Sequence, residues 1–316
     1  MKITVLDGNA LNPGDLDWSS LEEFGSYKVF PRTQKEDVVS RIADSDAILL
    51  NKISITEEVL SACPNLKYIG VQATGYNVID LEACRKHNVT VTNVPSYSTA
   101  GVAQLTFAFI SEAACRIRAH SESVMNGDWI KCPDFCYQKA PLTELEGKTL
   151  GIFGYGSIGK KVAAIAEAYG MNILTTTRTV KEDTPNPVTF ETLLSESDIL
   201  TLHAPLTEKT KGIINISTLS KMKKSAWLIN TARGAFVNEK ELAEALKNNI
   251  IAFYAADVIS EEPMLKENPL LTVPKEKILL TPHIAWAAKE TRERLLKIVI
   301  ENLRGWVNGK PQNVVS

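Results

Sequence analysis

Residues 149–170 read TLGIFGYGSIGKKVAAIAEAYG, an apolar run followed by a glycine-rich turn and an amphipathic segment. A strand, a turn of the form GxGxxG and a helix, in this order, are typical of the first βαβ unit of a dinucleotide-binding domain. The glycine at 154 permits the tight turn, the one at 156 lets the backbone approach a pyrophosphate, and the one at 159 lets the helix pack on the sheet. The free N–H groups that begin the helix then bind the anion. We expect this site to comprise Gly154, Tyr155, Gly156, Ser157, Ile158 and Gly159.

Apolar runs continue toward the C-terminus and alternate with helical patterns. Seven runs are expected to form strands: 148–154, 171–177, 188–190, 198–205, 226–230, 250–258 and 277–283. One of the helices between them opens with Asn238 and Glu241 in capping-box spacing. The runs are continuously apolar, as in strands that helices cover on both faces. This half of the chain therefore predicts a doubly wound parallel sheet, the Rossmann fold.

The N-terminal part of the chain shows a second series of the same kind. Apolar β-branched runs at 2–6, 27–30, 47–50, 67–71 and 89–94 alternate with helix-like segments. Such alternation predicts βαβ units and another parallel sheet. A chain of 316 residues also exceeds the size at which a single core keeps growing. We therefore predict an α/β fold with two doubly wound parallel-sheet domains.

One long amphipathic helix is expected after residue 285. Its apolar stripe consists of Ala288, Leu295, Val299, Leu303 and Trp306. Because the second sheet is already complete, this helix either caps that domain or returns to the first one.

The longest apolar stretch, 101–117, predicts a helix over about 100–120 that is buried on most sides. It is shorter than the roughly 20 apolar residues of a membrane span. Residues 121–147 follow as a long irregular excursion that contains Trp129, Phe135 and Tyr137. Long loops with such aromatic residues are usually functional or interfacial. The alternative is a loop that packs on itself.

The composition is that of an ordinary globular protein, with 44% hydrophobic residues, 23% charged residues and a formal charge of −2. It lacks the basic surplus of a nucleic-acid-binding protein, and its start lacks the apolar run of a signal peptide. The five cysteines include no CxxC pair, so neither a disulfide framework nor a metal site is indicated. We expect a cytoplasmic protein with no metal and no membrane or nucleic-acid partner.

The choice of dinucleotide is indicated by residues 174–181, LTTTRTVK. They follow the glycine turn at the distance where NAD-binding domains usually place an acid on the adenosine ribose, but Thr177 and Arg178 stand there instead. A carboxylate would repel a 2′-phosphate, whereas a hydroxyl and a guanidinium suit it. We therefore expect NADP(H) to be favoured over NAD(H). Alternatively, Arg178 points to solvent or stacks on adenine, and NAD(H) still binds through its pyrophosphate.

Four histidines are candidates for proton transfer. His87 and His120 lie near polar helix ends and are expected to be solvated. His203 and His283 end strands of the second sheet, where ligands of open parallel sheets bind. Only these two are expected to face a nicotinamide ring.

Three successive strands of the second sheet end in polar residues of different kinds. The strand at 226–230 delivers Arg233, the next delivers Glu261 or Glu262, and the last delivers His283. Reduction of a carbonyl leaves charge on oxygen, and histidine is the natural donor of the proton that this oxygen needs near neutrality. A carboxylate can hold the imidazole, and an arginine can bind a carboxylate while polarising the neighbouring ketone. The set matches a 2-keto acid substrate.

With these residues in view, the sequence resembles the D-isomer-specific 2-hydroxyacid dehydrogenase family over essentially its whole length. The resemblance rests on GYGSIG at 154–159, NTARG at 230–234, DVISEEP at 257–263 and TPHIAW at 281–286. Within the family, VLDGNALNPGDLDW at 5–18 and ATGYNVID at 73–80 look like the glycerate dehydrogenases, also called hydroxypyruvate reductases. This implies NAD(P)H-dependent reduction of hydroxypyruvate to D-glycerate, and of glyoxylate to glycolate. The alternatives are a D-lactate or phosphoglycerate dehydrogenase, or a non-catalytic regulator that senses a dinucleotide.

The resemblance also implies catalytic roles. Arg233 is expected to polarise the substrate, Glu262 to support the histidine and His283 to donate the proton. Arg233 and His283 are then substrate-binding residues as well. The backbone amides around Ala73, Thr74 and Gly75 are expected to hold the substrate carboxylate.

The same resemblance extends the expected cofactor site beyond the glycine turn. Asp257 is expected to meet the nicotinamide amide. The other contacts expected along the strand ends are His203, Ala204, Pro205, Thr210, Thr231, Ala232, Arg233 and His283.

The domain organisation implied by the resemblance has two parts. Residues 1–100 with 287–316 form a flavodoxin-like substrate-binding domain, and 101–286 form the Rossmann domain that binds NAD(P). The cofactor is expected in a cleft between them. Residues 121–147 are expected to form a dimer arm, which makes the protein a homodimer. Cofactor choice is not inherited from the family, because the ribose-binding acid is absent.

Overall fold

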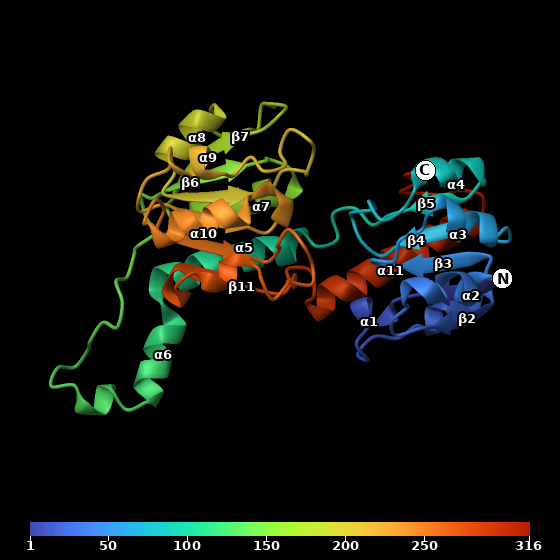
Figure 1. Cartoon of the computed structure of the whole chain (residues 1–316), viewed down its shortest axis with the longest axis horizontal. Helices are drawn as coiled ribbons and strands as arrows, with labels where there is room; N and C mark the ends of the chain where they lie inside the picture. Colours follow the sequence, from blue (N-terminus) through green and yellow to red (C-terminus); the bar gives the residue numbers. More distant parts are fainter. The chain divides into compact units, whose positions relative to one another are not determined.

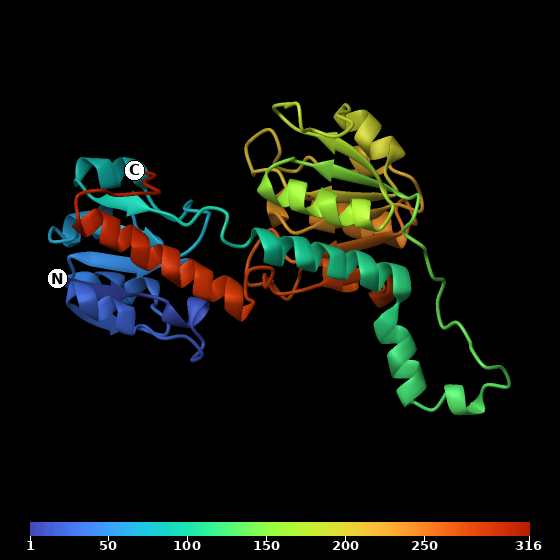
Figure 2. The same cartoon turned by 180° about the vertical axis from the view of Figure 1, so that it is seen from behind.

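The computed structural model describes residues 1–316, and the chain divides into two compact units. Unit 1 comprises Met1–Ser98 and Trp286–Ser316, and unit 2 comprises Thr99–Ala285. Each unit is built on its own parallel sheet (Figures 1 and 2). The prediction of two parallel-sheet α/β domains is therefore confirmed.

The sheet of unit 1 has five parallel strands in the order β2-β1-β3-β4-β5. The strands are β1 (Lys2–Val5), β2 (Ser26–Val29), β3 (Ala47–Leu50), β4 (Tyr68–Val71) and β5 (Thr90–Thr92). The helices that connect them are α1 (Gly8–Leu11), α2 (Val38–Ile42), α3 (Glu57–Ala62) and α4 (Leu81–Lys86), with the 3-10 turns η1 (Ser19–Phe24) and η2 (Lys35–Asp37). Leu60 of α3 and Cys84 of α4 belong to the core on one face of the sheet. All five predicted strands of this part of the chain are present.

The long helix α11 (Lys289–Val307) covers the other face of the unit 1 sheet, where it crosses the strands in Figure 2. Leu295, Val299 and Leu303 are buried there in one cluster with Leu49 and Tyr68. The apolar pattern alone left open which sheet this helix covers, and the family resemblance grouped it with residues 1–100. It covers the sheet of unit 1. Ala288, predicted to belong to the apolar stripe, is instead the exposed residue just before the helix.

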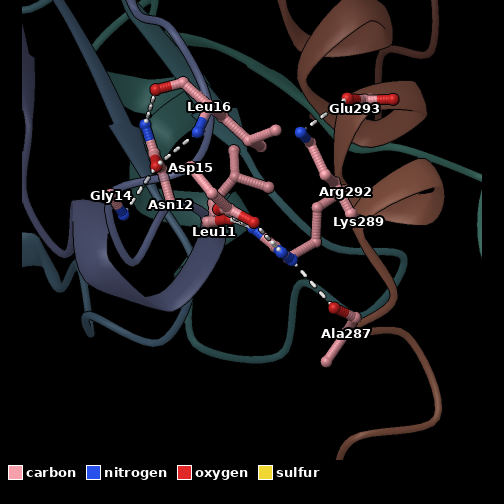
Figure 3. Close-up of polar contacts among 9 residues, drawn as sticks. All are labelled: Leu11, Asn12, Gly14, Asp15, Leu16, Ala287, Lys289, Arg292 and Glu293. Carbon is pink, nitrogen blue, oxygen red and sulfur yellow. Dashed lines mark hydrogen bonds and ion pairs between the residues drawn. The ribbon is translucent and has the colours of Figure 1, made fainter.

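Arg292 fastens the beginning of α11 to the loop that follows α1 (Figure 3). Its two terminal nitrogens donate to the two carboxylate oxygens of Asp15, each at a distance of 2.7 Å. The same guanidinium donates to the carbonyls of Leu11, at 3.1 Å, and Ala287, at 2.8 Å. The hydrogen bonds from the Arg292 guanidinium hold the pKa of Asp15 below its usual value. The bidentate geometry fixes the loop on the helix.

The sheet of unit 2 has six parallel strands in the order β11-β10-β9-β8-β6-β7. The strands are β6 (Thr149–Phe153), β7 (Asn172–Thr176), β8 (Ile199–Leu202), β9 (Trp227–Asn230), β10 (Phe253–Ala256) and β11 (Ile278–Leu280). Helices α5 (Thr99–Cys115) and α7 (Ser157–Ala168) pack on one face. Helices α8 (Phe190–Glu196), α9 (Ile216–Leu219) and α10 (Glu239–Lys247) pack on the other. The short turns η4 (Gly234–Phe236), η5 (Pro269–Thr272) and η6 (Lys275–Lys277) complete the unit.

The prediction of a strand at 188–190 is wrong. Thr189 accepts a hydrogen bond from the backbone N–H of Thr192 at 3.2 Å and so caps α8, which already begins at Phe190. The cap therefore overrides the β-propensity of this short run. By contrast, the predicted cap at Asn238 is confirmed, since its Oδ1 accepts from the N–H of Glu241 at 3.3 Å.

The helix predicted over about 100–120 is divided in two. Arg116 has a φ of +49° and ends α5, and α6 (Ile117–Met125) follows in a new direction. Arg116 is held there because its guanidinium donates to the carbonyl of Glu276 at 2.8 Å. Helix α6, η3 (Trp129–Lys131) and the chain up to about 145 project from the body of unit 2 (Figures 1 and 2). No helix of the chain combines the length and apolarity needed to cross a membrane.

Candidate active site

The glycine turn between β6 and α7 is shaped by two close backbone approaches. Gly154 has a φ of +101°, and a Cβ atom there would lie 2.4 Å from the nitrogen of Ala204. A Cβ atom on Gly159 would lie 2.3 Å from the carbonyl oxygen of Gly154. By contrast, a Cβ atom on Gly156 would meet nothing within 4 Å. The first and third glycines are therefore required by the protein itself, while the second leaves open space beside the backbone that suits a pyrophosphate.

The beginning of α7 is free to receive an anion. Gly156 is its N-cap residue and provides no side-chain cap. The first N–H groups of the helix therefore keep their partial positive charge for a ligand. The turn also lies at the topological switch point, because β6 separates β7 from β8 in the sheet. These features fit a dinucleotide.

The residues expected at the adenosine ribose follow β7. Thr177 is half-buried and Arg178 is exposed, and no carboxylate takes the place of either. The carbonyl of Thr176 accepts from the N–H of Gly154 at 2.8 Å. The end of β7 is thereby joined to the glycine turn.

His203 ends β8 beside the same turn, and its N–H donates to the carbonyl of Phe153 at 2.7 Å. Both ring nitrogens are inaccessible and have no hydrogen-bond partner. This burial lowers the pKa of His203 to about 3, so the ring is neutral. The loop with Ala204 and Pro205 continues to Thr210, whose hydroxyl donates to the carbonyl of Pro205 at 3.1 Å.

The turn after β9 presents Arg233. Asn230 closes this turn, because its Nδ2 donates to the carbonyl of Arg233 at 2.9 Å and its Oδ1 accepts from the N–H of Ala232 at 3.0 Å. Thr231 is buried and shares a 3.1 Å hydrogen bond with Thr106 of α5. The guanidinium of Arg233 remains exposed and donates to the carbonyl of Ala232 at 2.7 Å.

Two residues bring the loop after β10 against this turn. A Cβ atom on Gly234 would lie 1.8 Å from the carbonyl carbon of Ile259, so only glycine allows these two backbones to meet. Glu239, the first residue of α10, accepts from the N–H of Ser260 at 2.6 Å and from the amide of Asn268 at 2.8 Å. The loop that carries the acidic candidates is thus fixed at both ends.

The structure brings Glu262 and His283 together. His283 Nδ1 lies 2.6 Å from Glu262 Oε2, and the side chains are 29% and 33% exposed. The N–H of Ile259 donates to the other oxygen of Glu262 at 3.2 Å. No bond joins Glu261 to this histidine. Strands β9, β10 and β11 are neighbours, so Arg233, Glu262 and His283 emerge from adjacent strand ends.

Asp257 holds the loop that carries His283. Its buried carboxylate accepts from the hydroxyl of Thr281 at 2.5 Å and from the N–H groups of Ile284 and Ala285, each at 2.8 Å. Burial raises the pKa of Asp257, although these bonds partly oppose the shift. His283 itself has a φ of +54°, a conformation that costs a non-glycine residue roughly 1 kcal/mol or more. Oδ2 of Asp257 accepts only the N–H of Ala285, so it keeps a lone pair for the expected contact with the nicotinamide amide.

The loop Ala73–Gly75 follows β4 in unit 1. The hydroxyl of Thr74 donates to the carbonyl of Val94 at 2.8 Å, and Asn93 Nδ2 donates to the carbonyl of Thr74 at 2.8 Å. The N–H of Val94 donates to the carbonyl of Ala73 at 3.0 Å. The loop is thereby fixed through its carbonyls and side chains, which leaves its N–H groups for a ligand.

The other histidines are structural. The prediction that they are solvated fits in part, because each ring is half-buried and also hydrogen-bonded. His87 Nε2 lies 2.6 Å from Glu57 Oε1, and His120 bonds through both nitrogens, to the carbonyl of Arg116 and to the N–H of Lys139. Each links two segments that are distant in sequence, which local polarity does not reveal. No group of His, Cys, Asp and Glu side chains is arranged to hold a metal ion.

Sequence reasoning missed the residues that support the site. Asn230, Gly234, Glu239 and Thr281 set the loops on which Glu262 and His283 stand, and the carbonyl of Thr281 also accepts from the N–H of His283 at 3.0 Å. The signal available in the sequence was their place directly beside the motifs, as in NTARG. Their partners lie on other strands, so spacing alone did not assign them.

Residues 107–285 match the family described as D-isomer specific 2-hydroxyacid dehydrogenase, NAD binding domain. The match covers more than half of the chain and includes all the strand ends of unit 2. The chain belongs to this family. The 2-hydroxyacid dehydrogenase is therefore an oxidoreductase that acts on CH–OH groups and uses a nicotinamide dinucleotide.

Similar proteins span the whole dehydrogenase. It is 41% identical to a hydroxypyruvate reductase of Blautia hydrogenotrophica, with 100% of both chains covered. It is 37% identical to a glycerate dehydrogenase of Methylorubrum extorquens, over 99% of this chain and 98% of the relative. Among solved structures, an acyclic imino acid reductase in complex with NADPH and D-Arg matches with a TM-score of 0.87, 30% identity and full coverage of both chains.

Proposed function

We propose that this dehydrogenase reduces hydroxypyruvate to D-glycerate, and glyoxylate to glycolate, with a reduced nicotinamide dinucleotide. The observation that carries the proposal is the 2.6 Å hydrogen bond between His283 Nδ1 and Glu262 Oε2. This bond orients the imidazole and leaves Nε2 to protonate a ketone oxygen. The similarity to a hydroxypyruvate reductase and to a glycerate dehydrogenase supports the choice of substrate.

The catalytic residues have separate tasks in this proposal. The bound nicotinamide supplies a hydride to the keto carbon, and His283 supplies the proton to the keto oxygen. Glu262 accepts from Nδ1 and so keeps the ring in place through proton transfer, helped by its own bond from Ile259 N–H. Arg233 binds the substrate carboxylate and places positive charge beside the oxygen on which negative charge develops.

The proposed cofactor site is the glycine turn, the start of α7 and the strand ends that carry Thr177, Arg178, His203 and Thr231. NADP(H) is favoured over NAD(H) in this proposal. The support is the exposed guanidinium of Arg178 and the lack of an acid at its neighbour Thr177. The similar imino acid reductase, which was solved with NADPH, is consistent with this choice.

The proposal assigns substrate binding to unit 1 and dinucleotide binding to unit 2. The N–H groups of the Ala73–Gly75 loop hold the substrate carboxylate, since their carbonyls and side chains already have partners. Backbone N–H groups bind carboxylates well because they are fixed before the ligand arrives.

Residues 121–147, most of which lie in the projecting segment, are proposed to be a dimer arm. Met125, Ile130 and Phe135 are 83%, 89% and 89% exposed, which leaves large apolar side chains in water on a single chain. A second copy of the chain that covers them makes the protein a homodimer. A cytoplasmic location completes the proposal and rests on the composition alone.

The experiment is a substrate panel followed by absorbance at 340 nm. Hydroxypyruvate, glyoxylate, pyruvate and a bulkier keto acid are each tested with NADPH and with NADH. We expect the highest kcat/KM with hydroxypyruvate and a lower KM for NADPH than for NADH. Turnover confined to pyruvate would contradict the proposed substrate, and a strong preference for NADH would contradict the proposed cofactor.

A further inference from the structure

An ion pair joins the first turn of α7 to the loop after β7. Lys160, which follows the last glycine of the turn, contacts the carboxylate of Asp183 through its ammonium. The side chains are 42% and 58% exposed, so water and a ligand can reach both. Surface pairs of this kind contribute little to stability. The position of the Lys160–Asp183 pair, beside the glycine turn, therefore says more about ligand binding than about stability.

The loop that carries Asp183 is fixed along the end of β7. Thr175 donates to the carbonyl of Pro185 at 2.7 Å, and Asn186 donates to the carbonyl of Ile173 at 2.9 Å. Within the loop, the N–H of Lys181 donates to the hydroxyl of Thr184 at 2.9 Å. Asp183 is thus held next to the strand end where a Rossmann domain binds the adenosine ribose.

The ammonium of Lys160 also lies close to the glycine turn, 5.8 Å from the ring centroid of Tyr155. The side chain therefore stands between the turn that binds the pyrophosphate and the loop beyond β7. The exposed cations Arg178 and Lys181 belong to that same loop. Asp183 is the anion that neutralises Lys160 when no ligand phosphate is present.

We propose that Lys160 is a second ligand of the 2′-phosphate of NADP(H), beside Arg178, and that Asp183 is an exchangeable counterion which the phosphate displaces from Lys160. The inference rests on the proposed preference for NADP(H). A phosphate carries more charge and more acceptor oxygens than the carboxylate, so it competes for the ammonium. Asp183 lowers the affinity for the 2′-phosphate because it must be displaced and because it repels the incoming anion. NAD(H), which has a hydroxyl at this position, makes no such exchange.

The test measures binding of adenosine 2′,5′-bisphosphate and of 5′-AMP to the full-length protein by isothermal titration calorimetry. Asp183→Asn keeps the shape of the side chain and removes its charge, so we expect the bisphosphate to bind about threefold to tenfold tighter. Lys160→Met removes the cation, and we expect the bisphosphate to bind about tenfold more weakly. Binding of 5′-AMP should stay within about twofold in both variants.

Glu82→Gln is the matched control, since it breaks the exposed Lys86–Glu82 pair of unit 1 and should leave both ligands unaffected. Unchanged affinity for the bisphosphate in both variants would overturn the inference, as would weaker binding of 5′-AMP to Asp183→Asn, which would make Asp183 a ribose ligand. These readouts do not depend on turnover. Failure of the substrate or cofactor proposal appears instead in the wild-type kinetic panel, so the outcomes are distinguishable.

Discussion

The two halves of the unit 2 sheet build their sites in different ways. The proposed nucleotide half, around β6, β7 and β8, binds mainly through its backbone, with open space beside Gly156 and an uncapped helix start. The proposed catalytic half, around β9, β10 and β11, acts through side chains that other residues hold, as Glu262 holds His283. We therefore expect larger side chains to impair ligand binding in the nucleotide half, and truncated side chains to impair turnover in the catalytic half.

The largest effect is expected from removing the imidazole in the catalytic half. His283→Ala should lower kcat about 1,000-fold, because no other group at this strand end donates a proton. Dinucleotide affinity, measured by fluorescence titration, should change by less than about twofold, since the nucleotide half is intact. His87→Ala, on the surface of unit 1, is the control and should retain turnover. Near-normal turnover of the first variant would remove the acid assignment.

A smaller effect is expected from adding atoms to the nucleotide half. Gly156→Val fills the space beside the turn and should weaken dinucleotide binding about 100-fold. The free energy of unfolding should fall by less than about 1 kcal/mol, because the added atoms meet no protein. Gly159→Val is the contrast, since its Cβ would lie 2.3 Å from a carbonyl. That variant should lose about 1–3 kcal/mol of stability. Equal stability loss in the two would contradict the division of roles.

Asp257→Asn tests the support beneath the catalytic half. An amide NH₂ would face the N–H of Ile284 or Ala285, where the carboxylate now accepts. The loop should loosen, and kcat should fall about tenfold. Asp198→Asn is the control, because this acid accepts from the N–H of Thr149 at the amino ends of the strands, away from the catalytic half. If both variants kept full turnover, the positioning role of Asp257 would be refuted.

The smallest effect concerns the buried histidine of the nucleotide half. Burial lowers the pKa of His203 to about 3, so the unfolded chain binds a proton at this residue below about pH 6.5 and the folded chain does not. Its contribution to stability is therefore complete above pH 6.5 and is lost as the pH falls. At pH 5.5 the loss should be about 1 kcal/mol relative to pH 8. Urea titrations of wild type and His203→Asn should show a shallower pH dependence for the variant. Parallel curves would mean that the ring is solvated.

Much of the nucleotide half can be predicted from sequence because its parts are contiguous. GYGSIG, the preceding strand and the following helix lie within 149–168, and the structure forms them there. The catalytic half was harder to predict, because its residues come from three strands. The rule that parallel strands end at one edge was enough to group Arg233 with His283. It was not enough to choose between Glu261 and Glu262.

The sequence by itself determined the class of fold, the glycine turn and the set of polar strand ends, because apolar periodicity and turn residues act over a few neighbouring positions. Spacing alone left the rest open, although the family resemblance had assigned Glu262 and grouped the last helix with residues 1–100. In the tertiary structure Glu262 rather than Glu261 meets His283, α11 packs on unit 1, and the helix after Thr99 ends at Arg116. Each of these outcomes depends on a partner far along the chain, such as Glu276 for Arg116. Local patterns carry no record of such partners, since the contact exists only after the chain has folded.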